Sequence, residues 1–509
     1  MFNFFNSEAA RLNHIITEGA KDAISDERIV EIEIQRFKTS QKRKEMFDGE
    51  KYFRGRHDIL DKKRTAIGED GELEEIKNLP NNRIVDNQYK KMVNQKANYL
   101  LGQPIVFRTE NVQYAECLKK IFNKRFMRLM KNLGKDSLNG GVGWLFPYYD
   151  EHGQFTFTKF KPYEVIPFWK DTDHTILECA IRIYDVAWYD KNGTEKLIQK
   201  VEVYDLKGIR YFTLSDGGKL QPDEPFFKTY MTMIDTDGNE QPLNWTKIPL
   251  IPFKYNAEEI PLIKNIKSLQ DGLNTIESNF QDSMEEDTRN TILVLVNYDG
   301  EKLGEFRKNL ATYGAVKVKT VDGAAGDLKT LQVEVNSENY KAILEIFKKA
   351  IIENAMGYDA KDDRLSGNPN QMNIQSMYSD IDLDANDMET EFQASFEELL
   401  WFVNCHLANA GFGDFENEEV EVIFNRDILI NESEAIENVS KSVDLSEETR
   451  IANHPWVDDV QAELERKKKE QEESIDSYAK SFNPALPTDE GDKLNNDLLS
   501  SLEQGGDDE

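Results

Sequence analysis

Two long helical stripes, separated by a short segment of different character, constrain the fold of this 509-residue chain more than any other feature. The first stripe places apolar residues three or four positions apart, at Leu262, Ile266, Leu269, Leu273, Ile276, Phe280 and Met284. This spacing puts them on one face of a helix of 3.6 residues per turn. A second helix, starting near Ser337, is predicted by a second stripe, which comprises Tyr340, Leu344, Phe347 and Ile351. The two helices therefore enclose a compact insert.

That insert, residues 287–336, has the pattern of a small α/β module. Strands are predicted at 291–298, 315–320 and 328–335, with a helix at 301–311. Elsewhere the pattern predicts helices at 22–64, 86–101, 113–133, 373–408, 431–445 and 456–481, and a strand at 418–425. A polar segment with Gly357, Gly367 and Pro369 precedes the helix at 373–408.

Residues 143–254 alternate apolar and polar side chains with turn signals between them, which predicts antiparallel strands and not a βαβ series. The fold class is therefore α+β. Residues 483–509 carry eight acidic residues and one lysine with little apolar content, so we expect them to be disordered.

Charge and cysteine content limit the function. With 63 Lys and Arg against 94 Asp and Glu, the net charge is −31, which argues against a protein that coats nucleic acid. It does not exclude a protein that DNA passes without binding tightly. The three cysteines are far apart, so a disulfide framework or zinc site is not expected, and no apolar run is long enough to span a membrane. We expect a soluble intracellular protein.

Motifs for catalysis are missing from the sequence. It contains no phosphate-binding loop, HExxH, GxSxG or GxGxxG in a suitable context, so we expect no catalytic residues, cofactor or metal. One alternative is a metal-dependent nuclease or nucleotide-driven DNA enzyme that uses the carboxylates of 380–391, where Asp380, Asp382, Asp384 and Glu391 match four calcium-loop positions. A helical apolar stripe runs through these residues, and position 6 is alanine, which favours an acidic helix face.

A second alternative rests on the basic segment 117–135, which has seven Lys and Arg and no acid between Cys117 and Lys135. An acidic scaffold protein that binds partners through this helix, without forming a ring, is consistent with that composition. The favoured interpretation is a surface helix that balances an acidic neighbour.

Several phrases, in order along the chain, resemble one protein family. They are YFRGRHDIL at 52–60, NNRIVDNQYKKMVNQKANYLLGQPI at 81–105, GVGWLFPYYDEHG at 141–153, KPYEVIPFW at 161–169, LIKNIKSLQDGLNTIESNFQDSMEED at 262–287, METEFQASFEELL at 388–400 and LSEETRIANHPWVDDVQAELER at 445–466. The ordered set is similar to the portal, or head–tail connector, proteins of tailed double-stranded-DNA bacteriophages, in particular those of long-tailed phages of Gram-positive hosts.

The resemblance implies a ring, usually of twelve subunits, at one vertex of the capsid in the virion, assembled in the host cytoplasm. Double-stranded DNA would be pumped through it by the terminase and later leave. Other implied partners are the major capsid and scaffolding proteins and a head-completion adaptor protein, with no membrane and no cofactor. The implied parts are a wing (1–255 and 373–430), stem helices (256–286 and 337–356), a clip (287–336), a tunnel loop (357–372), a crown (431–482) and an acidic tail (483–509).

The resemblance also implies site residues. The tunnel-loop residues expected to face DNA are Lys361, Arg364, Asn368 and Asn370. The residues expected to pack the stem are Leu269, Leu273, Ile276, Phe280, Leu344, Phe347 and Ile351. The eight carboxylates of 373–408 would suit a channel wall that does not bind DNA, and Lys348 is one of a few cations that would make weak contacts with phosphates.

Overall fold

The computed structural model describes residues 24–67, 71–76, 79–189, 193–234, 240–287, 292–296, 327–331, 337–361, 371–426, 432–457 and 460–482. The chain divides into two compact units. The first comprises Met1–Asp359 and Met377–Ile428, and the second comprises Ala360–Ser376 and Leu429–Glu509. Within the described residues, no helix combines the length and the apolar character needed to cross a bilayer.

The described part of the first unit begins with two short helices, each with a capping side chain at its N-terminus. Asp26 caps α3 by accepting the N–H of Arg28, and Ser40 caps α4 by accepting the N–H of Arg43. The elements of this region are α3 (Glu27–Thr39), α4 (Gln41–Phe53), the 3₁₀ turn η1 (Asp58–Asp61), β1 (Thr65–Ile67) and β2 (Leu73–Glu75). The helical pattern predicted within 22–64 is thus present as two α-helices and a turn.

The next region contains three helices, of which the sequence predicted two. They are α5 (Gln88–Leu101), α6 (Val112–Ile121) and α7 (Lys124–Gly140). The prediction of one helix over 113–133 was wrong because the chain breaks at Phe122, and Asn123 then caps α7 by accepting the N–H groups of Arg125 and Phe126. A side chain that caps a new helix offers the backbone an alternative to continuing the old one.

The predicted antiparallel β region is confirmed and forms separate sheets. One sheet has the order β13-β4-β5 and another the order β10-β9-β8-β7-β6, with every neighbouring pair antiparallel. The strands are β4 (Val142–Tyr149), β5 (Phe155–Phe160), β6 (Val165–Trp169), β7 (Leu177–Tyr189), β8 (Glu195–Asp205), β9 (Gly208–Leu214), β10 (Leu220–Lys228) and β13 (Ile251–Lys254). Shorter pairs are β11 (Met231–Ile234) with β12 (Glu240–Leu243), and β3 (Val106–Arg108) with β16 (Glu421–Ile423).

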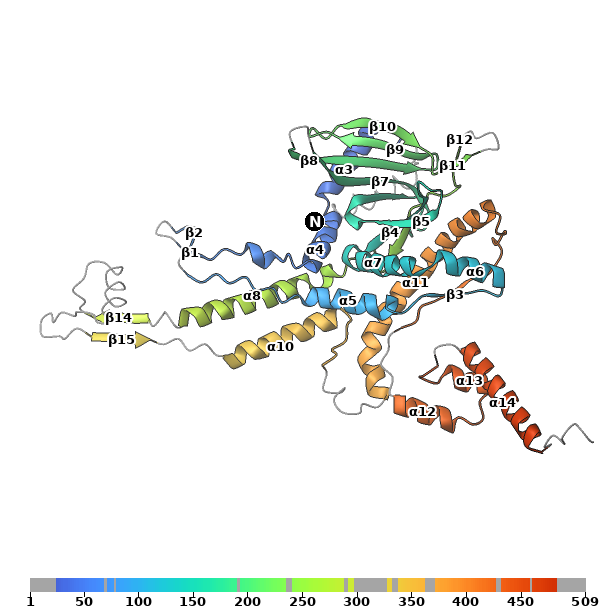
Figure 1. Cartoon of the computed structure of the whole chain (residues 1–509). Helices are drawn as coiled ribbons and strands as arrows, with labels where there is room; N and C mark the ends of the chain where they lie inside the picture. Colours follow the sequence, from blue (N-terminus) through green and yellow to red (C-terminus); the bar gives the residue numbers. More distant parts are fainter. Residues whose placement is uncertain are drawn as a thin grey trace, which may run out of the picture. The chain divides into compact units, whose positions relative to one another are not determined.

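A hydrophobic core fixes α3 on the five-stranded sheet. Val30 and Ile34 of the helix are buried against alternate residues of the strands, including Ile181, Val201 and Phe212. Alternate side chains of a strand point to the same face, so one face of this sheet is apolar and carries the helix (Figure 1).

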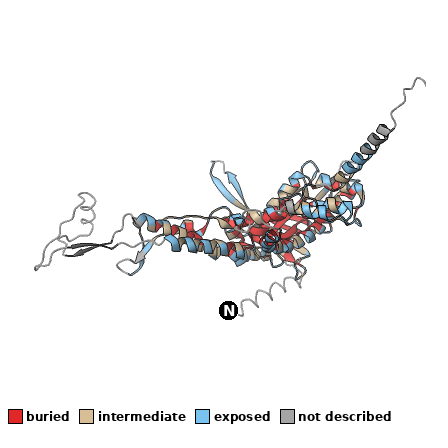
Figure 2. Cartoon of the chain, turned by 90° about the horizontal axis from the view of Figure 1, so that it is seen from below, coloured by how far each residue is buried: buried red, intermediate tan, exposed pale blue. Residues whose placement is uncertain are grey.

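The two predicted long helices are α8 (Ile263–Asp287) and α10 (Ser337–Asn354). Between them, β14 (Ile292–Val296) pairs antiparallel with β15 (Asp327–Leu331), in agreement with two of the three predicted strands. The strand predicted at 315–320 and the helix predicted at 301–311 lie outside the described residues. In Figure 2 buried residues are concentrated in the body of the first unit, and the burial pattern of α10 is mainly exposed or half-buried.

The last elements are mainly helical. The predicted helix at 373–408 is α11 (Gln371–Asn409), which carries buried aromatic residues such as Phe392, Phe396 and Phe402. The second unit contains α12 (Glu432–Lys441), α13 (Glu447–Ala452) and α14 (Val460–Phe482). The sequence predicted two helices here, whereas the structure has three. The additional helix, α13, begins at a cap in which Ser446 accepts the N–H of Thr449.

Candidate functional site

A ladder of buried polar side chains runs along α8. Gln270, Asn274, Ser278 and Asp282 lie four residues apart, and each is at most 4% exposed. Four residues of helix rise about 6.0 Å, close to the roughly 6.6 Å that two residues of extended chain span. Side chains spaced four residues apart on a helix can therefore each reach every second backbone N–H group of an extended segment that lies beside the helix.

Residues 79–87, which precede α5, are that segment, and we call them the strap. Asp282 accepts the N–H of Asn82 at 2.6 Å, Ser278 accepts that of Ile84 at 2.9 Å and Asn274 accepts that of Asp86 at 3.1 Å. Gln270, one helical turn earlier, accepts the N–H of Tyr89 in the first turn of α5 at 2.9 Å and donates to the carbonyl of Asp86 at 2.7 Å. The ladder thus supplies the hydrogen bonds that the strap lacks from any sheet.

A charged cluster fixes the first half of α8 to the N-terminal helices. Lys267 donates to Asp58 at 2.5 Å, to the Tyr52 hydroxyl at 2.9 Å and to Asp271 at 3.0 Å. Burial and the hydrogen bond to Asp271 raise the pKa of Tyr52 above its usual value, so the phenol stays protonated. His57, stacked on Tyr52, accepts from Asn274 at 2.8 Å, and burial lowers its pKa.

The contact between α8 and α10 depends on one small residue. Phe347 lies so close to Gly272 that a Cβ atom at that position would be 2.5 Å from the ring. Farther along, the rings of Phe280 and Tyr340 are 4.6 Å apart. Of the seven predicted stem residues, Leu273 and Ile351 are buried, and Leu269, Ile276, Phe280, Leu344 and Phe347 are half-buried within one chain.

Other apolar side chains of α10 are left exposed by the described part of the chain. Ile343 is 40% exposed and Ile346 is 64% exposed, and Met284 near the end of α8 is 46% exposed. Lys348, one of the cations expected to contact DNA weakly, pairs with Asp86 of the strap at 2.8 Å and with Glu277 of α8 at 3.6 Å. Its charge therefore links three segments of the same chain.

The end of α10 is held by side chains of α5. Gln95 accepts the N–H of Tyr358 at 3.1 Å and donates to its carbonyl at 2.8 Å, while Lys96 donates to the carbonyl of Met356 at 3.1 Å. Met356 itself has a left-handed backbone with φ of 49°. These bonds fix the residues at which the chain leaves α10.

Beyond that point lie the predicted tunnel-loop residues. Lys361 is exposed, whereas Arg364, Asn368 and Asn370 lie outside the described residues. The geometry therefore does not test this set of residues, and their role stays a prediction.

The carboxylates of 380–391 lie on a continuous helix, as the apolar stripe indicated. Asp384 pairs with buried Lys96 at 2.6 Å and accepts from the hydroxyl of Tyr255 at 2.5 Å. Arg426 lies 3.0 Å from Asp382 and 2.7 Å from Glu389. A straight helix cannot wrap these groups around one cation, and the described residues contain no cluster suited to a metal. Nothing here supports the nuclease alternative.

These ion pairs also change the expectation for a channel wall. We expected the eight acidic side chains of 373–408 to present unpaired charge at the channel wall. Three of them, Asp382, Asp384 and Glu389, instead form ion pairs with cations of the same chain. The sequence did not reveal this because Lys96 and Arg426 are distant from those acids along the chain.

The cations of the basic segment 117–135 make no ion pair with the described residues of the chain. Within the part of the chain that the structure describes, no carboxylate lies within 4.0 Å of any of its seven cationic groups, Lys119, Lys120, Lys124, Arg125, Arg128, Lys131 and Lys135. Burial and repulsion by Lys131 and Lys90 lower the pKa of Lys135. Backbone hydrogen bonds lower the pKa of Asp150, and the charge of Arg125 adds to this effect, so one acidic neighbour does act on the segment. Balance of the whole helix face by acidic neighbours stays a prediction.

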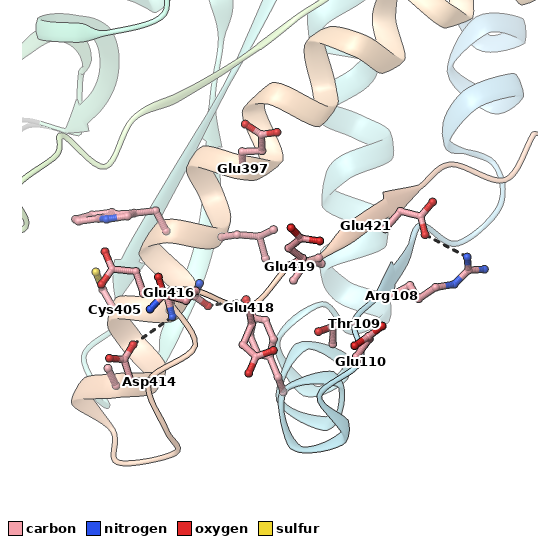
Figure 3. Close-up of a pocket in the computed structure, with 17 residues that line it drawn as sticks. Arg108, Thr109, Glu110, Glu397, Cys405, Asp414, Glu416, Glu418, Glu419 and Glu421 are labelled. Atoms are coloured by element: carbon pink, nitrogen blue, oxygen red, sulfur yellow. Dashed lines mark hydrogen bonds and ion pairs between the residues drawn. The ribbon is translucent and has the colours of Figure 1, made fainter.

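A second charged feature is a cavity lined by acidic side chains. A cavity of about 1330 Å³ is lined by seven carboxylates from the ends of β3 and α11 and from residues 414–421. Figure 3 shows Glu421 paired with Arg108 at one side of this cavity and Cys405 at the other. Burial and the nearby Glu416 raise the pKa of the Cys405 thiol, which keeps it protonated and weakly nucleophilic.

Comparison with known proteins gives consistent results over most of the chain. The sequence model of the family described as "Phage portal protein, SPP1 Gp6-like" matches residues 34–477. The portal protein of Bacillus phage SPP1 is 29% identical over 485 residues, which are 94% of this chain and 93% of that protein. The portal protein of Clostridium phage phiCD119 is 28% identical over 452 residues, covering 86% of this chain and 96% of that protein.

Solved structures give a more distant likeness. A chain from the neck of an empty GTA particle, computed with C6 symmetry, aligns with a TM-score of 0.40 and 12% identity, over 72% of this chain and 89% of that chain. A chain from the neck of the native GTA particle, computed with C12 symmetry, aligns with a TM-score of 0.37 and 12% identity, over 72% and 88%. These scores are too low to carry structural detail from one chain to the other.

Proposed function

Because the chain belongs to the SPP1 Gp6-like family of phage portal proteins, we propose that it forms a ring-shaped channel at one capsid vertex and joins the head to the tail. The observation that carries this proposal is the family match over residues 34–477. Double-stranded DNA would enter through the channel during packaging, driven by the terminase, and leave through it on ejection. The chain itself would have no catalytic role.

The helix pair supports a ring. The exposed Ile343 and Ile346 need a partner surface, since apolar patches on a helix are usually covered by another protein. A neighbouring copy that uses a different part of its surface would give a head-to-tail contact, and such contacts form a ring when the rotation between copies closes. We propose twelve copies, with α8 and α10 as stem helices around the channel and 287–336 as the clip.

The remaining parts follow the same proposal. The N-terminal helices, the β sheets and α11 would form the wing, α12 to α14 the crown, and residues 357–372 the tunnel loop beside DNA. The major capsid protein, the scaffolding protein and a head-completion adaptor would contact the ring from outside. The virion vertex is the proposed final location, with assembly in the host cytoplasm.

Complementation of a packaging-deficient phage tests the function. Procapsids made without this protein should contain no DNA, and supplying the chain in trans should restore DNA per particle and head–tail joining together. Filled heads made without the chain would overturn the proposal, as would particles that regain DNA without the chain being incorporated at a vertex.

A further inference from the structure

A groove between α7 and the β4–β5 hairpin has no place in the proposed function. Its volume is about 550 Å³, and α7 lies beside the hairpin along it (Figure 1). Arg125, Arg128 and Asn132 line the α7 side, and Thr156 and Thr158 line the side of β5. Its floor includes the aromatic rings of Phe126 and Phe157, whose centroids are 5.0 Å apart.

The strand on this groove is an edge strand. Among the described strands, β5 pairs with β4 and lies at the end of the order β13-β4-β5. An edge strand presents a row of backbone N–H and C=O groups that can pair with another extended chain. Its sequence Phe155–Phe160 carries no proline that would block such pairing.

The charges beside that edge are unbalanced. Arg125 and Arg128 are exposed, and no described carboxylate is within 4.0 Å of either guanidinium. Lys159, also in the groove, is already paired with Asp136. One carboxylate, Asp150, lies at the rim, where its oxygen accepts the N–H groups of His152 and Gln154. Arg125 also acts on Asp150 electrostatically, without an ion pair. The cations that make no ion pair among the described residues therefore lie on the helix side of the groove.

We propose that this groove binds an extended acidic segment of a partner protein as a fourth strand beside β5. Backbone groups of the segment would pair with the edge of β5, and its acidic side chains would meet Arg125 and Arg128. Alternate residues of a strand are about 6.6 Å apart, which the two long arginine side chains, one helical turn apart, can match. Duplex DNA fits less well, because it cannot pair with a strand edge and two cations supply few phosphate contacts.

A fluorescein-labelled peptide of four Glu-Val repeats tests the proposal on purified wild-type rings by fluorescence anisotropy. We expect saturable binding, with hydrogen-exchange protection of the amides in Phe155–Phe160. The double variant Arg125→Glu/Arg128→Glu should weaken binding by about tenfold or more, because it replaces two attractions by repulsion. The matched double variant Lys207→Glu/Lys341→Glu changes the same number of charges outside the groove and should leave binding within about twofold.

Two modified peptides separate the parts of the proposal. A peptide with alternate amides N-methylated keeps every charge but cannot pair with a strand, and a Lys-Val peptide reverses the charge; both should fail to bind. Equal binding of the N-methylated peptide would overturn strand addition. Tighter binding of a 20-base-pair duplex, lost in the Arg125→Glu/Arg128→Glu variant, would overturn the peptide in favour of DNA. Binding by single chains but not by rings would assign the groove to the contact between subunits.

Discussion

Asn274 shows how much one polar side chain of α8 supports. It is fully buried, accepts the N–H of Asp86, donates to His57 and receives a hydrogen bond from Gln270. The sequence does not reveal this role, because an asparagine next to the apolar stripe of a helix is normally expected to face solvent. The partner backbone lies 188 residues away, and sequence patterns report only local neighbours.

Replacing Asn274 should therefore be costly. We expect Asn274→Ala to lower the free energy of unfolding by roughly 1–3 kcal/mol, because the amide of Asp86 and the His57 ring lose partners in a buried place. Urea denaturation followed by intrinsic fluorescence measures the change. The exposed neighbour Thr275, whose hydroxyl bonds only its own helix, provides the control Thr275→Ala, for which we expect a change below about 0.5 kcal/mol. Equal effects of the two variants would contradict the role of the ladder.

Glu259 gives a prediction about pH. Burial disfavours its charge, but Lys42 at 2.5 Å and His174 at 2.8 Å outweigh burial and lower the pKa of Glu259 to about 2. The ordinary pKa is 4.5, so the stabilisation is complete above about pH 4.5 and is lost as the pH falls toward 2.

The variant Glu259→Gln tests this assignment. We expect it to reduce the free energy of unfolding by on the order of 3 kcal/mol at pH 7 and to flatten the decline of stability between about pH 4.5 and 3. Urea midpoints measured across that range for both proteins give the comparison. Parallel declines in the two proteins would show that other carboxylates govern acid stability.

At the scale of elements, the sequence predicted helices and strands well where one periodicity persisted. The stripes of α8, α10 and α11 were visible because their apolar faces pack inside the chain. The break between α6 and α7 was missed because it depends on capping by Asn123, which competes with a continuous helical pattern. The strap was missed because its hydrogen bonds come from side chains of α8 and leave no periodicity of its own.

The exposed face of α10 makes the contact between subunits testable. We expect Ile346→Asp to prevent ring formation while single chains stay folded, since an aspartate there is solvated in the single chain but would be buried without a partner in the ring. Phe280 is a less specific target because its ring already contacts Tyr340 of the same chain. Size-exclusion chromatography and circular dichroism measure the two properties, and Val112→Asp, at a 75% exposed site on α6, is the matched control that should keep the ring. Rings of normal size from Ile346→Asp would place the contact elsewhere.

The segment after α10 carries the prediction closest to DNA transport. The double variant Lys361→Glu/Arg364→Glu should assemble normally, because both residues belong to a polar segment of the sequence and surface charges contribute below about 1 kcal/mol to folding. It should lower packaged DNA per procapsid, because like charges would then face the phosphates of DNA in the channel. Unchanged packaging, with ring formation checked on the same protein, would remove these two residues from the DNA contact and leave the portal function intact.

For the whole molecule, family membership accounts for features that a single chain leaves incomplete. Within the described residues of one chain, Ile343 and Ile346 of α10 stay exposed and the cations of α7 make no ion pair. A subunit of a larger assembly is expected to have such surfaces, whereas an enzyme is expected to have a convergent set of catalytic groups. The family and the function were predicted from the ordered sequence phrases. The ion pairs could not be predicted, because their two partners are distant from each other along the chain.

The central claim, that this chain functions as a ring, is tested most directly by the mass of the purified protein. Mass photometry of the wild-type chain should give one main species near twelve copies of the 58.8-kDa subunit, about 706 kDa, and electron micrographs of the same fraction should show a central pore. A neighbouring whole-number multiple with a pore would change only the ring size. A single species near 58.8 kDa at micromolar concentration, or a compact oligomer without a pore, would contradict the account.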